Sequence, residues 1–202
     1  RRVLFRSREG NVWVVDLRSI NPREAKEYPS ETGKGHTITK FSPEGKVLLV
    51  IGKPGVAGDP PEALTEPTSI VVAPNGDLFI TEGHGGQSPA SKPNPVARVS
   101  HYTREGKFVQ AWGKFGDGEM EFRTPHDIAM DEQGRLYVAD RGNNRIQVFD
   151  PDGKLLRILT VPVTAPPGAQ PWMGNPTTAT KGTQTPGAPW TVCITPGPTQ
   201  YL

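Results

Sequence analysis

The chain has 202 residues and a nearly balanced charge, with 23 Lys and Arg against 21 Asp and Glu for a formal net charge of +2. The basic residues are scattered, which argues against a nucleic-acid-binding face or a basic membrane-surface patch, and no apolar run approaches the ~18 residues of a membrane span. Cys193 is the single cysteine, so no internal disulfide is available. Gly (23) and Pro (22) are frequent and spread along the chain, which favours short strands joined by tight turns.

The N-terminal heptapeptide, residues 1–7, reads RRVLFRS and has neither strand alternation nor a turn signal. It resembles a translated cloning or sequencing scar, so we expect it to lie outside the fold. The next stretch, GNVWVVD (10–16), is typical of the second strand of a unit whose first strand should precede it. Residues 8–67 are therefore expected to hold a partial first repeat and a connection.

A repeat runs through the rest of the chain. The stretches SIVVAPNGDLFITEG (69–83) and DIAMDEQGRLYVADR (127–141) each contain an alternating strand, a polar turn with one glycine and a second alternating strand. A second hairpin accompanies each repeat, with turn glycines Gly45, Gly106 and Gly153. Four strands per repeat predict an all-β fold, a β-propeller with about three blades in this chain.

The repeat sets the expected boundaries of the blades. Residues 68–125 should form the second blade and 126–161 the third, followed by a Pro/Gly/Thr-rich inter-blade loop over 162–189. Residues 190–202 should begin a further, truncated blade. We therefore expect the chain to be a fragment, and unpaired strand edges should make it poorly soluble when expressed alone.

Two segments, RLYVADRGNNRIQVFDPDGK (135–154) and WGKFGDGEMEFRTPHDIAMD (112–131), resemble NHL-repeat propellers. More narrowly, they are similar to the catalytic domain of peptidyl-α-hydroxyglycine α-amidating lyase and its bacterial relatives. The resemblance covers about residues 10–160. It implies a six-bladed ring in which three histidines, each at the start of the innermost strand of a different blade, hold Zn²⁺ on the axis.

His126 follows a proline in the same context as these ligands and matches the middle one. The slot of the first ligand falls at Arg2, inside the suspected scar, and the third would lie beyond Leu202. At two intervening slots the family lacks the histidine, and here Thr68 and Trp190 occupy them. The resemblance thus implies Zn²⁺ as a cofactor, with Ca²⁺ as a second candidate metal. The alternative for His126 is an ordinary solvated histidine at a blade start.

Two further residues match catalytic positions of the family. His84 stands where the family has a tyrosine base, and histidine can transfer protons near neutral pH. Arg141 matches an arginine on the side of the cavity that faces the substrate carboxylate, which a guanidinium fork would suit. The alternatives are a loop residue for His84 and a packing residue for Arg141.

Two functions follow as hypotheses. The first is a zinc-dependent carbon–nitrogen lyase that acts on a small-molecule or peptide substrate and releases an amide and glyoxylate. The second is a non-catalytic propeller that binds a protein or another ligand on one face. Histidines in the other axial slots and retained zinc would favour the first. We expect a monomer when the ring is complete, and the family resemblance favours a periplasmic or extracellular location.

Overall fold

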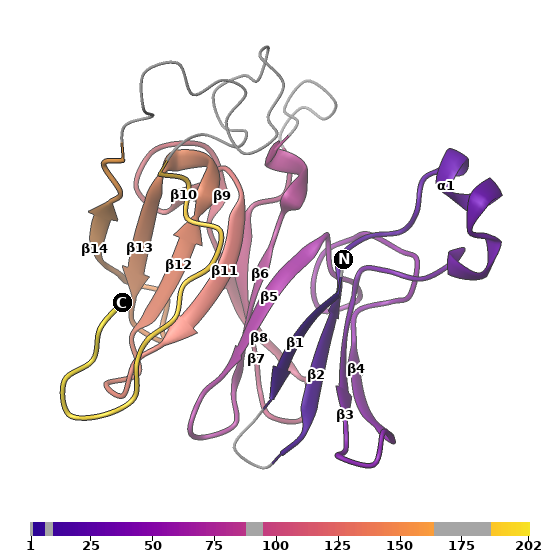
Figure 1. Cartoon of the computed structure of the whole chain (residues 1–202), viewed down its shortest axis with the longest axis horizontal. Coiled ribbons are helices and arrows are strands. Elements are labelled where there is room, and N and C mark those ends of the chain that lie inside the picture. The colour runs from indigo at the N-terminus through magenta and orange to yellow at the C-terminus, as the bar shows by residue number, and fades with distance from the viewer. Residues whose placement is uncertain (1, 7–9, 88–94, 164–186) are drawn as a thin grey trace. The chain divides into compact units, whose positions relative to one another are not determined.

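The computed structural model describes residues 2–6, 10–87, 95–163 and 187–202. Most of its strands form three four-stranded sheets, each with its strands in chain order (Figure 1). The sheets contain β1 (Arg2–Arg6), β2 (Val12–Asp16), β3 (Thr37–Phe41) and β4 (Val47–Ile51); β5 (Pro67–Val72), β6 (Leu78–Glu82), β7 (Arg98–Tyr102) and β8 (Phe108–Trp112); and β11 (Pro125–Met130), β12 (Leu136–Asp140), β13 (Arg145–Phe149) and β14 (Leu155–Thr160). This sheet order is typical of propeller blades, and the predicted four-stranded repeat is confirmed.

The hairpin turns form where the repeat places them. In the β11–β12 turn, the Asp131 carboxylate accepts backbone N–H bonds from Gln133 (3.0 Å) and Arg135 (2.8 Å). Gly134 completes this turn at φ +80°, a left-handed conformation that disfavours a side chain. Asp150 plays the same part in the β13–β14 turn by accepting from the backbone N–H of Lys154 at 2.8 Å. The short polar residue and the glycine thus act together to close each turn.

The N-terminal residues differ from the expectation. Arg2–Arg6 form β1, which pairs antiparallel with β2 from Arg2 opposite Asp16 to Arg6 opposite Val12. The structure therefore places them in the slot of the missing first strand and not outside the fold. The physical reason is that a ladder is made by backbone groups, so a segment without alternation can still pair with an open strand. The origin of the heptapeptide stays a prediction.

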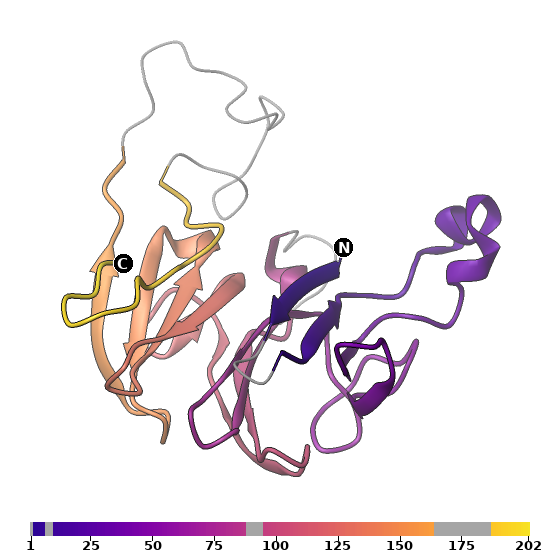
Figure 2. The same cartoon turned by 60° about the horizontal axis from the view of Figure 1, so that its bottom comes forward.

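The strand repeat does not predict the one α-helix of the described residues. Helix α1 (Pro22–Glu27) is followed by the 3₁₀-helix η1 (Pro29–Glu31), and neither contains a buried residue. Figure 2 shows this pair standing clear of β1–β4. Asn21 caps α1 by accepting from the backbone N–H groups of Arg23 and Glu24, while the Glu24 side chain accepts from the Asn21 backbone N–H. The signal was the capping box in Asn-Pro-Arg-Glu.

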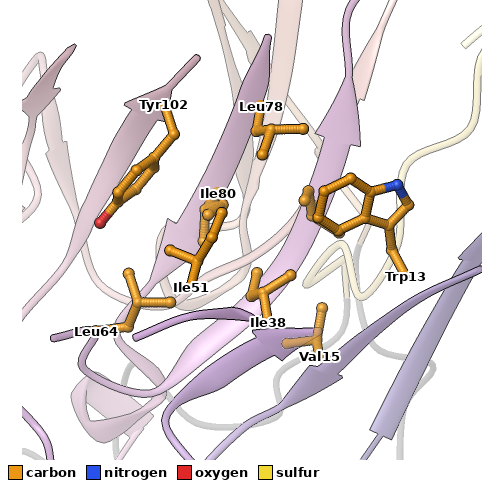
Figure 3. Packing of buried hydrophobic residues seen from close by; sticks show 9 residues of the cluster. Trp13, Val15, Ile38, Ile51, Leu64, Leu78, Ile80 and Tyr102 are labelled. Atoms are coloured by element: carbon orange, nitrogen blue, oxygen red, sulfur yellow. The ribbon is translucent and has the colours of Figure 1, made fainter. Parts of the chain in front are cut away.

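The structure divides into two compact units, Arg1–Glu82 with Ser100–Gln110, and Gly83–Val99 with Ala111–Leu202. The first unit has an apolar core that Figure 3 shows from close by. Trp13 and Val15 of β2, Ile38 of β3 and Ile80 of β6 are all at most 1% exposed. The remaining buried members are Ile51, Leu64, Ile70, Leu78 and Tyr102. The alternating apolar positions of the repeat therefore supply this core.

The second unit has a smaller apolar cluster on β11–β14, in which Val148 and Ala139 are fully buried. Before this sheet, the short strands β9 (Lys114–Phe115) and β10 (Glu121–Phe122) pair in parallel. Arg145 holds their connection by donating to the backbone carbonyls of Asp117 (2.9 Å), Gly118 (2.7 Å) and Glu121 (2.8 Å). The repeat pattern of the sequence does not predict strands in this connection.

The C-terminal segment also differs from the expectation. Within the described part of residues 162–202, no strand is formed, although a further blade was expected to begin at 190. A backbone hydrogen bond from the Thr195 N–H to the Tyr201 carbonyl (3.0 Å) closes a turn. The segment, yellow in Figure 1, is attached to the third sheet by side chains, among them Asp127 and Glu132, instead of by a backbone ladder. Most of the predicted inter-blade loop, residues 164–186, lies outside the described residues.

Candidate functional site

The start of β11 contains a β-bulge at His126. Pro125 pairs with Asp140 and Asp127 pairs with Ala139, so His126 is the extra residue between two paired positions. The start of β5 repeats this pattern, because Pro67 pairs with Glu82 and Ser69 with Thr81, with Thr68 between them. The two slots that the sequence aligned therefore share one local backbone form. Bulges redirect a side chain out of the regular alternation and are frequent beside functional sites.

The side chains at the two bulges, Thr68 and His126, make different hydrogen bonds. Thr68 is buried, and its hydroxyl donates to the Thr81 carbonyl oxygen (3.1 Å) and lies 2.8 Å from the Thr81 hydroxyl. His126 is half-buried, and its Nδ1 lies 2.6 Å from the main-chain carbonyl oxygen of Trp190. A carbonyl oxygen only accepts, so Nδ1 carries the proton and the lone pair of the neutral ring sits on Nε2. Metal-binding histidines are commonly oriented by such a bond.

His84 lies beside His126. It opens the 3₁₀-helix η2 (His84–Gln87), directly after β6, and the two imidazole ring centroids are 5.7 Å apart with the rings tilted by 51°. The close approach of η2 depends on Gly86. A Cβ at that position would collide with the Arg123 carbonyl oxygen and come within 3.1 Å of the Phe115 ring. Backbone packing at a glycine therefore brings the two histidines together.

Arg141 completes the group of predicted site residues. It follows β12 in the 3₁₀-helix η3 (Arg141–Asn143), is fully buried, and donates its backbone N–H to the Thr124 carbonyl at 3.0 Å. Its guanidinium carbon lies 4.3 Å from the centroid of the Trp190 indole, a cation–π arrangement. The same indole meets the His126 ring edge-on at 5.1 Å. His126 and Arg141 thus contact the same aromatic residue, and His84 lies beside His126.

Trp190 is the functional candidate that sequence reasoning missed. The sequence indicates only that Trp190 stands in a slot where a histidine is absent. The signal for it was its slot, because the innermost-strand starts of successive repeats are the positions at which side chains converge in a propeller. Its contacts with Arg141 depend on the course of residues 187–202, which the repeat did not predict.

A buried carboxylate lies behind the site. Asp140, fully buried, accepts from the Arg123 backbone N–H (2.9 Å), Asn143 Nδ2 (2.8 Å) and Arg145 Nε (2.8 Å). Burial raises the pKa of Asp140, against the opposing effect of these hydrogen bonds and of the nearby Arg145 charge. Glu82 occupies the same place in the preceding repeat, where it accepts from the Thr65 backbone N–H at 2.7 Å. Each carboxylate therefore secures the backbone that leads into the bulged strand.

The described residues do not by themselves supply the ligand set of a zinc site. No group of three or more His, Cys, Asp or Glu side chains able to hold a metal ion occurs among them. Zinc sites need three or four protein ligands. The orientation of His126 fits a ligand, since Nε2 is its basic nitrogen, but His126 and His84 do not make a complete donor set. Any metal bound here needs ligands from outside the described residues.

A separate hollow of about 270 Å³ lies on the second unit. Its wall includes Asp131, Arg135, Tyr137 and Arg157 together with residues of the C-terminal segment, and none of the three predicted site residues lines it. The Asp131 carboxylate already accepts hydrogen bonds from Arg135 and from the Tyr137 hydroxyl.

None of the described helices has the length and apolar character needed to cross a membrane.

The family model of the NHL repeat matches residues 122–149, which run from the end of β10 through β13 and include His126 and Arg141. NHL repeat-containing protein 3 of Homo sapiens is 38% identical over 148 residues, which cover 71% of this chain and 36% of that protein. Peptidyl-glycine alpha-amidating monooxygenase B of Xenopus laevis is 29% identical over 149 residues, 70% of this chain and 14% of that protein. The chain spans well under half of the length of these relatives.

Among solved structures, one described as a streptogramin B lyase superposes with a TM-score of 0.50 at 20% identity, over 80% of this chain and 41% of that one. This likeness concerns the fold. Together with the three four-stranded sheets, it shows the β-propeller fold, and residues 122–149 of this fold match the NHL repeat. Within that class, the chain resembles the peptidylglycine α-amidating proteins and NHL repeat-containing protein 3.

Proposed function

We propose that this chain is part of an amidating-lyase-like enzyme that cleaves the N–Cα bond of a peptidyl-α-hydroxyglycine or a similar carbinolamide. The observation that carries the proposal is the orientation of His126. Its Nδ1–H is held by the Trp190 carbonyl at 2.6 Å, which leaves Nε2 as the ligand nitrogen, and a second imidazole, His84, lies beside it. The similarity to the amidating proteins over 70% of the chain supports the same function.

In this proposal His126 contributes one ligand to Zn²⁺, and the other ligands come from parts of the intact protein outside these 202 residues. Bound zinc would act as a Lewis acid that polarises the substrate oxygen. Ca²⁺, the second candidate metal, takes about six to eight oxygen ligands, and no acidic cluster near His126 offers them in the described residues. Zinc is therefore the metal to test first.

The chain's own residues would bind the substrate and move its proton. The substrate hydroxyl loses its proton to a base, its carbon–oxygen bond becomes the aldehyde of glyoxylate, the C–N bond breaks and the amide nitrogen gains a proton. His84 is positioned beside His126 to take the hydroxyl proton. Arg141 would bind the carboxylate through its N–H edge, because one face of its guanidinium is covered by Trp190.

The test uses the intact natural protein that carries this chain. We expect it to retain zinc through purification and to convert a peptidyl-α-hydroxyglycine probe into the amide and glyoxylate. The variant His126→Ala should lose the zinc and the activity. The matched control is His101→Ala, because His101 is paired with Asp77 at 3.1 Å and stacked on Phe79 within the first unit. Equal zinc content and activity in wild type and His126→Ala would overturn the proposal.

A second candidate function is a binding scaffold without catalytic activity. The identity of 38% with NHL repeat-containing protein 3, a relative whose name states only its repeats, favours it. Under this alternative, the intact protein is folded but carries no zinc and does not turn over the probe. Arg141 and Trp190 then serve packing alone.

The lyase proposal carries a location with it, in the periplasm or outside the cell. Fractionation of the producing cells, with N-terminal sequencing of the mature protein, tests this point. Recovery of the protein in the cytoplasm with an uncleaved N-terminus would contradict it.

A further inference from the structure

The carboxylate of Asp127, the residue after His126, ties β11 to the C-terminal segment. Its Oδ1 accepts from the backbone N–H of Ile128 in its own strand at 2.9 Å. Its Oδ2 accepts from the Thr191 hydroxyl at 2.5 Å and from the Val192 backbone N–H at 3.0 Å. Residues 190–192 are thus held to the strand by a side chain and not by a sheet ladder.

This attachment determines where Trp190 lies. Val192 follows Thr191, and its side chain is buried in the apolar cluster of the third sheet. Fixing residues 191 and 192 leaves Trp190 at the His126 ring, with its carbonyl oxygen 2.6 Å from Nδ1 and its indole 4.3 Å from the Arg141 guanidinium carbon. One acidic residue therefore controls contacts to two of the three predicted site residues.

We propose that Asp127 and Trp190 are positioning residues of the site. Asp127 holds the 190–192 segment in place. The Trp190 carbonyl can then keep the proton of His126 on Nδ1, so that Nε2 is the nitrogen that would bind the metal. The Trp190 indole in turn holds the guanidinium of Arg141 by stacking on its face. The effect on catalysis rests on the proposed lyase function, whereas the effect on the His126 tautomer is independent of it.

The tautomer is measured directly on the intact protein with ¹⁵N-labelled histidine, without substrate, after a chelator has removed bound metal, and at a pH at which the ring is neutral, because a metal ion on Nε2 would by itself keep the proton on Nδ1. The imidazole nitrogen shifts of His126 should report protonated Nδ1 in the wild type. Asp127→Ala should produce a mixture of the two tautomers, and Thr191→Val, which removes one of the two bonds to the segment, should produce a smaller change. Asp152→Ala, on an exposed turn of the same sheet, is the matched control and should change nothing.

Activity separates the two positioning roles. Because partners that orient a metal ligand typically contribute about 10- to 100-fold, Asp127→Ala should lower kcat by about that factor. Trp190→Ala keeps the main-chain carbonyl and so should leave the tautomer intact, but it removes the stack on Arg141 and should raise KM for the carboxylate-bearing probe. Trp190→Phe should restore most of that KM, since a phenyl ring can still stack on the guanidinium.

The outcomes distinguish this proposal from the function on which it builds. A tautomer shift in Asp127→Ala and Thr191→Val, in a protein that does not turn over the probe, supports the positioning role and refutes the lyase function. An active wild type whose His126 tautomer is unchanged in both variants overturns the positioning role. If Asp127→Ala does not fold, Thr191→Val decides alone, because it removes one hydroxyl at an exposed position.

Discussion

Truncation of Asp140 should destabilise the protein far more than truncation of a carboxylate on the surface. The Asp140 side chain is 0% exposed. It forms an ion pair with Arg145 (2.8 Å), whose side chain is 11% exposed. Replacing it with alanine removes the partner of a largely buried guanidinium, a change that typically costs about 3–5 kcal/mol. It also releases the Arg123 backbone N–H that leads into the His126 bulge.

The matched control is Asp117→Ala. Its carboxylate is 68% exposed and lies 3.9 Å from Arg123, so its loss should cost about 1 kcal/mol or less. Urea unfolding of the intact protein at neutral pH, with both variants and the double variant Asp140→Ala/Arg145→Ala, measures the difference. Asp140→Ala should lower the free energy of unfolding by several kcal/mol, and the double variant by much less than the sum of the single losses. Equal losses in Asp140→Ala and Asp117→Ala would refute the reasoning.

The pH dependence of the same variant tests the balance between burial and ion pairing. Burial raises the pKa of Asp140 above its ordinary value of 3.8, despite the hydrogen bonds that oppose the shift. A raised pKa in the folded state means that the stabilisation from this group is full below pH 3.8 and is lost as pH rises through the folded pKa. The gap in unfolding free energy between wild type and Asp140→Ala should therefore widen on acidification. A gap that narrows would mean that the Arg145 pair outweighs burial.

Two further predictions concern the packing and the turns. Ile80 lies in the core of the first unit with its side chain 0% exposed, so Ile80→Ala should lower the free energy of unfolding by about 2–5 kcal/mol. The Val109 side chain is 48% exposed, so Val109→Ala should change the free energy of unfolding by about 1 kcal/mol or less. Thermal and urea unfolding measure both changes. For Asp131, burial alone would raise the pKa, but the hydrogen bonds from Arg135 and Tyr137 together lower it. A lowered pKa gives stability that is present above pH 3.8 and is lost as pH falls through the folded pKa. Asp131→Asn should therefore be less stable than wild type at neutral pH and should approach the stability of wild type in acid. A difference in unfolding free energy that stays constant across this pH range would contradict the lowered pKa of Asp131.

The sequence by itself determined the repeat. Alternating apolar residues and turn glycines recur with the period of a blade, and both features act locally, through strand alternation and through backbone conformations such as that of Gly134. The slots at the start of each innermost strand could be found in the same way, because they are defined by their distance from those glycines. The hairpins, the four-stranded units and the shared place of Thr68 and His126 were therefore open to prediction, and α1 would have been from its capping box.

Tertiary structure decided how the site residues meet. His84 approaches His126 because Gly86 packs against the backbone at Arg123, and Arg141 meets Trp190 because Asp127 holds a segment that no ladder holds. These contacts join residues that are far apart in the chain, and no local period encodes them. The same holds for β1, whose backbone pairs with β2 although its residues show no alternation. Local pattern depends on neighbours along the chain, whereas a site depends on which surfaces the folded chain brings into contact.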